Sequence, residues 1–378
     1  MSRCALVVQR RMTHYRAPFF NCLREHLAAH DIELRLAYGQ CTSDEATKGD
    51  SADIPWARRL PTRYFLGGRI CWQSLAAVAS GCDIVVMTHE NKLILNLLEQ
   101  FRRSGRRVAL WGHGANLQSD PGSARERFKR LVARQADWWF GYTSLSVPLI
   151  RKSGFPLERI TVLNNAVDTQ ELAALFAMVT PATQTALRER LGLQGSRVGV
   201  FVGSLYTQKR VDLMLEAALR IRQRVPDFEF LIMGSGPDLN KVERFCAANS
   251  WAYSLGVVTG WEKAAILSLG RVMLNPGLVG LGILDSFVCG VPMLTMDRGG
   301  HSPEIAYLEN GVNGAITANS MDDYVQAVCA VLTDDGLHAK LHDGCVRSAG
   351  RYTIENMASE FSAGVEQCLA APIYRGRT

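Results

Sequence analysis

Short apolar runs in the first half of the chain alternate with amphipathic segments of helical length. The β-rich runs lie at residues 4–9, 32–39, 83–89, 106–114, 137–143 and 159–168. Between them, residues 18–29 and 94–101 repeat apolar side chains at helical spacing, for example Phe19, Leu23 and Leu27. Strands that alternate with helices predict a parallel sheet with crossover helices.

The second half repeats this alternation. We predict strands at residues 198–205, 228–234, 256–260, 272–275 and 291–296, and helices at 211–225, 238–249 and 284–289. Hydropathy alone would suggest a membrane span between residues 264 and 296, but glycines and prolines divide this stretch into short pieces. We interpret it as buried strands and a buried helix around a glycine loop.

The whole pattern predicts an α/β protein with two Rossmann-like domains. We place the first domain at residues 1–175, a helical linker at 176–196 and the second domain at 197–352. We expect a C-terminal helix at 353–378 to pack back toward the first domain.

Composition and charge narrow the class of protein. With 47% hydrophobic and 21% charged residues in 378, the chain can bury large cores, which excludes disordered and coiled-coil classes. Residues 1–180 hold 24 Lys and Arg against 16 Asp and Glu, a net charge of +8, and the remaining 18 against 20 give −2. The first half therefore faces either an anionic partner or solvent. We expect no nucleic acid partner.

The ten cysteines are scattered without a CxxC pair or zinc-type spacing, so we expect buried thiols and no metal site. The first residues hold an apolar run of about five residues followed by arginines, too short for a secretory signal. We therefore expect a reducing, cytoplasmic location.

Candidate chemistry follows the predicted strands of the second domain, where ligands bind in open α/β sheets. Gly203 and Ser204 are followed by Lys209 and Arg210, just before a helix. A cation beside a helix N-terminus suits a phosphate, although a solvated Lys-Arg pair explains the same pattern. Further along, Gly234, Gly236 and Pro237 form either a tight turn or a close backbone approach to a ligand.

A glycine loop at residues 277–282 opens the helix that carries Asp285. The backbone amides of Gly280, Leu281 and Gly282 suit a diphosphate, and a carboxylate one turn later can bind ribose hydroxyls. Asp285 stands among apolar residues, so its carboxylate should be paired or bound to a ligand.

These three elements, in this order, resemble the C-terminal domain of retaining GT-B glycosyltransferases of family four, which includes many bacterial polysaccharide and lipopolysaccharide transferases. The resemblance covers about residues 198–315. It implies two Rossmann-like domains that face each other across a cleft, with acceptor binding in the first and nucleotide-sugar binding in the second.

The resemblance assigns roles to the donor-site residues. Lys209 holds the donor diphosphate, and Arg210, which replaces a family glycine, supplies a second charge. Gly203 matches the family, whereas Ser204 stands where an arginine is usual. The nucleotide base pocket corresponds to Gly234, Gly236 and Thr259.

This chain departs from the family's E-x7-E motif. Its second acid aligns with Asp285, which should bind the ribose, and its first acid aligns with Gly277, so we expect altered contacts to the donor sugar. Downstream, residues 299–304 and 310–314 look like two further glycine-containing stretches of the family.

In the first domain, residues 10–18 resemble a subgroup with a Tyr-Arg-x-Pro loop. Tyr15 and Arg16 are therefore expected to face the acceptor. His113 follows a predicted strand and is expected to contact the donor sugar or the acceptor as a catalytic residue, although a lone His after a strand is often structural. Asn116 is expected in the same acceptor site.

The expected function is that of a hexosyltransferase (EC 2.4) that transfers a sugar from a nucleotide-diphosphate sugar to a glycan or lipid-linked acceptor, with retention, in cell-surface polysaccharide biosynthesis. No metal or cofactor is expected. An inactive GT-B homologue and a sugar-nucleotide 2-epimerase remain alternatives. A nicotinamide oxidoreductase is disfavoured, because residues 8–18 contain no glycine.

A basic segment at residues 124–135 has Arg125, Arg127, Lys129, Arg130 and Arg134 against one acid. As an amphipathic helix it would either lie on an anionic membrane surface or pack on its own domain.

Overall fold

The computed structural model describes residues 3–46, 49–93, 105–114 and 134–374. The chain forms two compact units, one of residues 1–168 with 353–378 and the other of residues 169–352. The predicted helix at 94–101 and most of the basic segment at 124–135 lie outside the described residues.

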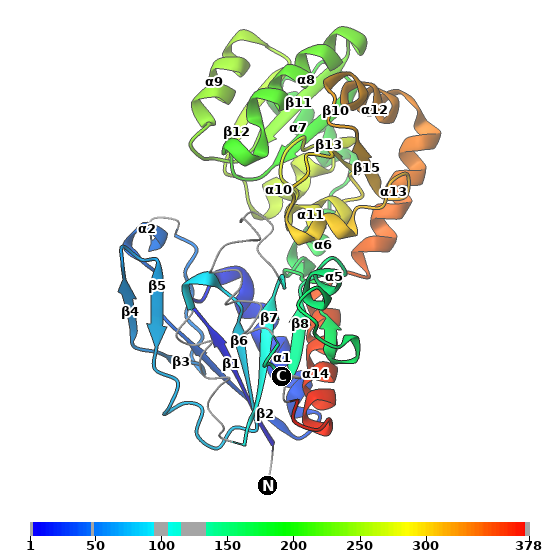
Figure 1. Ribbon diagram of the computed structural model, residues 1–378. Coiled ribbons are helices and arrows are strands. Elements are labelled where there is room, and N and C mark those ends of the chain that lie inside the picture. The colour runs from blue at the N-terminus through cyan, green and yellow to red at the C-terminus, as the bar shows by residue number, and fades with distance from the viewer. Residues whose placement is uncertain (1–2, 47–48, 94–104, 115–133, 375–378) are drawn as a thin grey trace. The chain divides into compact units, whose positions relative to one another are not determined.

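The first unit contains a parallel sheet in the order β3-β2-β1-β6-β7-β8-β9 (Figure 1). The strands are β1 (Arg3–Gln9), β2 (Ile32–Tyr38), β3 (Arg58–Arg59), β6 (Ile84–Thr88), β7 (Arg107–Gly112), β8 (Trp138–Gly141) and β9 (Ile160–Val162). All the strands predicted in this half are present. Because β1 has β2 on one side and β6 on the other, the strand order reverses between β1 and β6.

Helices cover this sheet. α1 (Ala17–Ala28) packs on β2, and the short α5 (Ser146–Arg151) and the C-terminal α14 (Ile354–Ala370) pack on β9. The one-turn helix α2 (Ser43–Ala46) lies in the connection between β2 and β3. α14 contacts α1, β8 and β9, and the Phe361 ring stacks on Phe140 at 4.3 Å between centroids. An antiparallel hairpin of β4 (Thr62–Phe65) and β5 (Ile70–Gln73), which the sequence pattern did not indicate, follows β3.

The second unit contains a parallel sheet in the order β12-β11-β10-β13-β14-β15. Its strands are β10 (Arg197–Val202), β11 (Phe228–Met233), β12 (Ala252–Gly256), β13 (Val272–Leu274), β14 (Met293–Met296) and β15 (Gly314–Thr317). This is the doubly wound order of Rossmann folds, and it reverses between β10 and β13.

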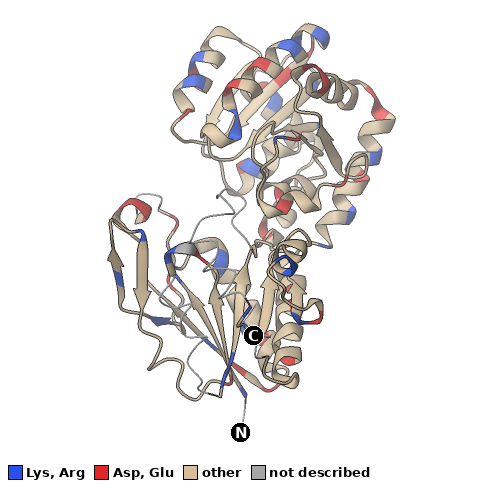
Figure 2. Ribbon diagram, viewed as in Figure 1, with Lys and Arg blue, Asp and Glu red and all other residues tan. Residues whose placement is uncertain are grey.

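The second unit's helices are α6 (Gln170–Ala177), α7 (Pro181–Leu191), α8 (Val211–Arg224), α9 (Leu239–Ala248), α10 (Gly260–Leu267), α11 (Gly282–Val288), α12 (Met321–Thr333) and α13 (Asp335–Ala349). α8 and α12 pack together, and their apolar faces join the strands in one buried core. α8 carries Asp212 and Glu216 in its N-terminal half and Arg220, Arg222 and Arg224 in its C-terminal half; Figure 2 colours acidic residues red and basic residues blue.

The predicted strand at 256–260 is wrong. The strand β12 ends at Gly256, whose φ of 66° lies in the left-handed region and breaks the extended conformation, and α10 begins at Gly260. Residues 176–196, expected as a linker, fall within the second compact unit and include α7.

The apolar stretch from 264 to 296 folds as expected, into the end of α10, then β13, a glycine loop, α11 and β14. Within the described ranges, no helix is both long and apolar enough to cross a membrane. The ten cysteines are free thiols, and six of them are buried.

Candidate functional site

The loops that follow β10 and β13 meet at the point where the strand order of the second sheet reverses. The first loop carries Lys209, and the second is the glycine loop that leads into α11. A backbone hydrogen bond from Leu278 N to Gln208 O, at 2.8 Å, joins them. Such a reversal point is where open α/β sheets bind their ligands.

Lys209 is partly buried beside the glycine loop. Its Nζ donates a hydrogen bond to the carbonyl oxygen of Leu278 at 2.6 Å. Burial lowers the pKa of Lys209 to about 8. No carboxylate in the described parts of the chain pairs with this ammonium group, so it is a cation without a counter-ion.

The beginning of the glycine loop is fixed by hydrogen bonds to its backbone. Thr295 Oγ1 donates to the carbonyl oxygen of Gly277 at 3.3 Å, and Ser302 N donates to that of Val279 at 3.1 Å. In contrast, the backbone N–H groups of Gly280, Leu281 and Gly282 have no hydrogen-bond partner among the residues that the structure describes. Three donors are therefore available to an anion next to Lys209.

The glycines of this loop have two different roles. A Cβ on Gly277 would overlap the backbone of Lys209, so the fold itself requires glycine there and leaves no room for the acid of the E-x7-E motif. A Cβ on Gly280 or Gly282 would come no closer than 3.6 Å to Ser302 Oγ or 3.8 Å to Val202 O. Packing does not require glycine at these two positions.

Gly203, Gly234 and Gly236 belong to a close contact between two backbone turns. A Cβ on Gly234 would overlap the carbonyl group of Gly203, and one on Gly236 would overlap that of Leu205. All three glycines have φ between 150° and 153°, which side chains disfavour. Packing therefore accounts for Gly234 and Gly236, and the backbone conformation for Gly203, without a ligand.

Arg210 also adopts a left-handed conformation, with φ of 53° and ψ of 48°. The family that this sequence resembles has glycine at this position, which suits this backbone conformation. The Arg210 side chain donates to Asn319 Oδ1 at 2.5 Å. Ser204, six residues earlier in the same loop, is exposed.

Asp285 lies on α11 and forms an ion pair with Lys263 of α10, with 2.8 Å between Nζ and Oδ2. Both side chains are about one-fifth exposed, at 18% and 21%. The apolar surroundings of Asp285 predicted a partner or ligand for its carboxylate, but no local pattern indicated Lys263. Thr259, which precedes α10, is exposed.

In the first unit, Tyr15, Arg16 and His113 lie in one aromatic cluster at the ends of β1 and β7. The guanidinium carbon of Arg16 is 5.5 Å from the ring centroid of Tyr15, 5.4 Å from that of Trp111 and 6.0 Å from that of Tyr142. The His113 ring lies edge-on to Tyr142 at 4.4 Å between centroids. Within the described ranges no carboxylate pairs with Arg16. Asn116 lies outside the described residues.

Arg10, at the end of β1, anchors the neighbouring loop through an ion-pair network that the sequence analysis missed. It contacts Glu45 at 2.8 Å and Glu90 at 2.6 Å. Burial opposes the charged form of Glu45, but hydrogen bonds from Arg10 prevail and the pKa of Glu45 falls to about 2. Their separation by 35 and 80 residues explains why no local pattern indicated these pairs.

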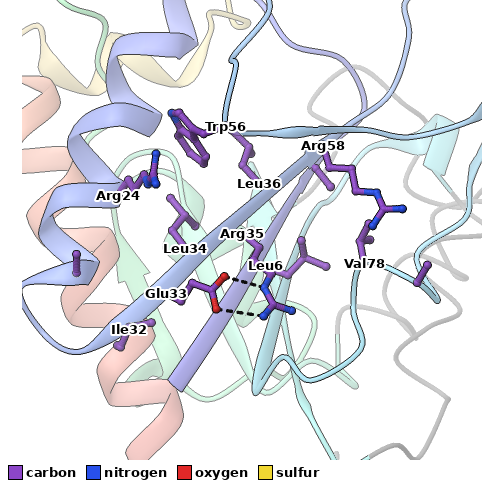
Figure 3. A pocket seen from close by; sticks show the side chains of 13 residues that line it. Leu6, Arg24, Ile32, Glu33, Leu34, Arg35, Leu36, Trp56, Arg58 and Val78 are labelled. Carbon is purple, nitrogen blue, oxygen red and sulfur yellow. Dashed lines mark hydrogen bonds and ion pairs between the residues drawn. The ribbon is translucent and has the colours of Figure 1, made fainter. Parts of the chain in front are cut away.

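A cavity of about 560 Å³ lies along β2 of the first unit (Figure 3). The Arg24 guanidinium lies over the Trp56 ring at 4.8 Å, and Glu33 and Arg35 form a two-pronged pair on β2. β3 pairs with β2 only at Ala37 and Tyr38.

The described residues include no cluster of His, Cys, Asp and Glu suited to a metal ion.

The known proteins that this chain resembles in sequence are glycosyltransferases. Residues 196–334 match the family described as "Glycosyl transferases group 1". A D-inositol 3-phosphate glycosyltransferase from Thermobispora bispora is 27% identical over 235 residues, which is 56% of this chain and 52% of that protein. A GDP-mannose-dependent alpha-(1-6)-phosphatidylinositol monomannoside mannosyltransferase from Mycolicibacterium smegmatis is 28% identical over 193 residues, 47% of this chain and 48% of that protein.

This chain spans about half the length of the curated relatives it matches. Its structure is similar to that of Anabaena Alr3699/HepE in complex with UDP, with a TM-score of 0.69, 14% identity, and coverage of 96% of this chain and 99% of that one. The chain therefore has the GT-B fold, and its residues 196–334 match the glycosyl transferase group 1 family.

Proposed function

We propose that this protein is a hexosyltransferase of the retaining type. It transfers a sugar from a nucleotide-diphosphate sugar to a glycan or lipid-linked acceptor in the biosynthesis of cell-surface polysaccharide. The group 1 domain at residues 196–334 and the GT-B fold support the reaction class. The retention of anomeric configuration and the polysaccharide role come from the resemblance to family four.

The proposed donor site rests on one observation about the glycine loop. Gly280 and Gly282 have no packing reason to be glycine, and with Leu281 they present backbone amides that have no partner among the described residues. These amides lie beside the ammonium group of Lys209, which has no carboxylate partner among the same residues. Glycine without a packing role allows a ligand to approach the backbone closely. A diphosphate fits these donors, and Asp285 on the following helix would bind the ribose.

The chemistry of transfer needs stabilisation of the leaving diphosphate as it gathers negative charge. Lys209 and the three loop amides are fixed donors in a partly buried place, where they stabilise charge more strongly than water does. In this proposal the leaving phosphate accepts the proton of the acceptor hydroxyl on the same face of the sugar. His113 contacts the sugar or the acceptor.

The acceptor site is assigned to the first unit, around Tyr15 and Arg16. A guanidinium among aromatic rings, with no carboxylate partner in the described parts of the chain, suits an anionic group such as a phosphate. The relatives named for inositol phosphate and phosphatidylinositol acceptors are consistent with this choice. A phosphate-bearing lipid-linked acceptor is therefore the preferred class.

Thermal shift with UDP, GDP, ADP and dTDP tests the donor site directly. A nucleotide at 100 times its dissociation constant should stabilise the protein by about 2.7 kcal/mol. Stabilisation by none of the four would contradict the proposed function.

The reaction itself is tested with the matching sugar nucleotide and a lipid-linked acceptor, with the anomeric configuration of the product read by NMR. Release of nucleoside diphosphate with a retained product is expected. Conversion of the sugar nucleotide without an acceptor would identify a 2-epimerase instead. Tight binding without turnover would identify an inactive homologue. Gly277, which replaces the first acid of the E-x7-E motif, is the reason for testing this outcome.

A further inference from the structure

His301 connects the glycine loop to the end of β14 through both nitrogens of its ring. Nδ1 is 3.1 Å from the backbone nitrogen of Val279, and Nε2 is 3.0 Å from the carbonyl oxygen of Met296. Val279 immediately precedes Gly280 and is fully buried. The ring is thus a side-chain contact to the residue that immediately precedes the three amides without a partner among the described residues.

The two partners define the protonation state of the ring. A backbone N–H can only donate, so Nδ1 must be an unprotonated acceptor, and a carbonyl can only accept, so Nε2 must carry the proton. Only the neutral Nε2–H tautomer satisfies both contacts. In an imidazolium ion, Nδ1–H would point at the N–H of Val279, and two donors would oppose each other.

We propose that His301, in this neutral tautomer, is a positioning residue that holds the amides of residues 280–282 in place for the donor diphosphate. Acidification then releases the loop and weakens donor binding. This inference rests on the proposed function, because it gives the donor site a pH dependence.

The surroundings of His301 agree with a ring that stays neutral at physiological pH. Burial lowers its pKa below the ordinary value of 6.5, while the hydrogen bond to Met296 acts in the opposite direction. Among the charged neighbours, Arg298 and Arg210 oppose the imidazolium form, and Asp297 favours it. The Val279 contact is therefore complete above pH 6.5 and is lost as the pH falls through the lowered pKa of His301.

Two variants separate the two ring contacts. In His301→Asn, the amide oxygen takes the place of Nδ1 and keeps an acceptor for Val279 without a titratable group. In His301→Gln, the longer amide takes the place of Nε2 and keeps the contact to Met296 but loses that to Val279. Both keep the side chain polar, and urea unfolding confirms that each variant is folded.

The measurement is the dissociation constant for UDP-glucose, or for GDP-mannose if the protein selects GDP, between pH 5 and pH 8. These probes are phosphodiesters without the phosphate ionisation near pH 6 that would complicate nucleoside diphosphates. At pH 7.5, His301→Gln should bind about tenfold more weakly than wild type, and His301→Asn about as tightly as wild type. Below pH 7, where Lys209 with its pKa of about 8 is already charged, wild-type affinity should fall on acidification, whereas that of His301→Asn should stay level.

Two results would overturn the proposal: wild-type affinity for His301→Gln at pH 7.5, or the same pH dependence in His301→Asn as in wild type. A failure of the proposed function is distinguishable, because wild type would then bind neither sugar nucleotide at any pH. In that case the ¹⁵N shifts of the His301 ring and hydrogen exchange of the Val279 amide still report the tautomer and the release of the loop. An Nδ1–H tautomer, or exchange that does not respond to acid, would refute the role of His301.

Discussion

Lys209 illustrates at the residue scale how a candidate ligand-binding group reduces the stability of the protein that carries it. Its pKa is lowered by burial from 10.5 to about 8, so the folded protein holds the charged form at a free-energy cost. The hydrogen bond to Leu278 offsets only part of that cost. No carboxylate among the described residues stabilises the charged form further, whereas a bound diphosphate would.

We therefore expect Lys209→Met to be more stable than wild type at pH 7 by about 1 to 3 kcal/mol while binding the donor nucleotide at least about tenfold more weakly. Between pH 8 and 10.5 the unfolded chain binds more protons at this residue than the folded one, so wild-type stability rises with pH and the advantage of the variant shrinks. Urea unfolding at pH 7 and 9.5, with calorimetric titration of the nucleotide, checks both. A destabilised variant with unchanged affinity would make Lys209 a structural residue.

The glycines of the loop allow a matched comparison of single substitutions. Gly280→Ala and Gly282→Ala should leave the free energy of unfolding within about 1 kcal/mol of wild type, because their methyl groups meet no close neighbour. The same methyl groups stand where a diphosphate would approach the amides, so donor affinity should fall about tenfold. Chemical denaturation and nucleotide titration measure the two effects.

Gly277→Ala is the control for that pair. Its methyl group would overlap the Lys209 backbone, so it should lower the free energy of unfolding by about 1 to 3 kcal/mol. If Gly280→Ala and Gly282→Ala lost stability as Gly277→Ala does, or bound nucleotide like wild type, the loop would have a packing role only.

At the element scale, the ion pair of Lys263 and Asp285 ties α10 to α11. Asp285→Asn should cost about 1 to 2 kcal/mol of stability, because it weakens a partly buried charge-assisted contact. If the carboxylate also binds ribose hydroxyls, the variant should lose nucleotide affinity, since a neutral amide cannot accept from both hydroxyls. Affinity and unfolding are measured on the same samples.

Lys263→Met breaks the same ion pair while leaving the carboxylate in place. It should lose similar stability but retain most of the nucleotide affinity. Equal losses of affinity in both variants would mean that Asp285 acts on the ligand only by holding α11 against α10.

The elements that the sequence predicted are those with a strong local signal. The apolar runs at β1, β10 and β11 and the amphipathic pattern of α8 agree with the structure within a few residues. The strand β12 was misplaced because its residues are only partly buried and carry a weak pattern, and Gly256 ends it where the valines begin. In the hairpin, β4 has no buried residue and β5 buries Cys71 and the polar Gln73, so the sequence showed no clear alternation of apolar and polar residues.

The sequence indicated which residues form the candidate site, but not which residues they contact in the fold. Strand order brings the loop of Lys209 beside the glycine loop, and the resemblance to a family indicated both. The partners Lys263 and Thr295, and the ring of His301 between Val279 and Met296, depend on chain segments that meet only in the fold. Likewise, the structure separates Gly277, which packing requires, from Gly280, which it does not.

At the scale of the whole molecule, the two halves of the chain differ in net charge and should therefore differ in their attraction to an anionic surface. Residues 1–180 have a net charge of +8 from 24 basic and 16 acidic residues, and the rest have −2 from 18 and 20. An anionic lipid surface would attract the first half and not the second. We propose that this attraction brings the first domain to a lipid-linked acceptor.

The basic segment is the part of the chain through which this attraction would act. Arg134 is unsuitable for substitution, because it donates a hydrogen bond to the Ser153 carbonyl. We therefore choose Arg127, Lys129 and Arg130, each of which contributes on the order of 1 kcal/mol near an anionic surface. The matched control replaces Arg244, Lys340 and Arg347, exposed cations of the second unit, and changes the net charge equally.

Co-sedimentation with vesicles of anionic and of neutral lipid measures the effect. Wild type and the control triple-serine variant should sediment with anionic vesicles only, and their binding should fall with salt because exposed charges are screened within about 10 Å at 0.1 M. Arg127→Ser with Lys129→Ser and Arg130→Ser should lose at least about tenfold in vesicle affinity. If both triple variants lost equal affinity, net charge rather than this segment would drive the binding. If wild type bound neutral vesicles equally, or bound none, the acceptor would be reached from solution, and the cation at Arg16 would have to recognise a soluble phosphate.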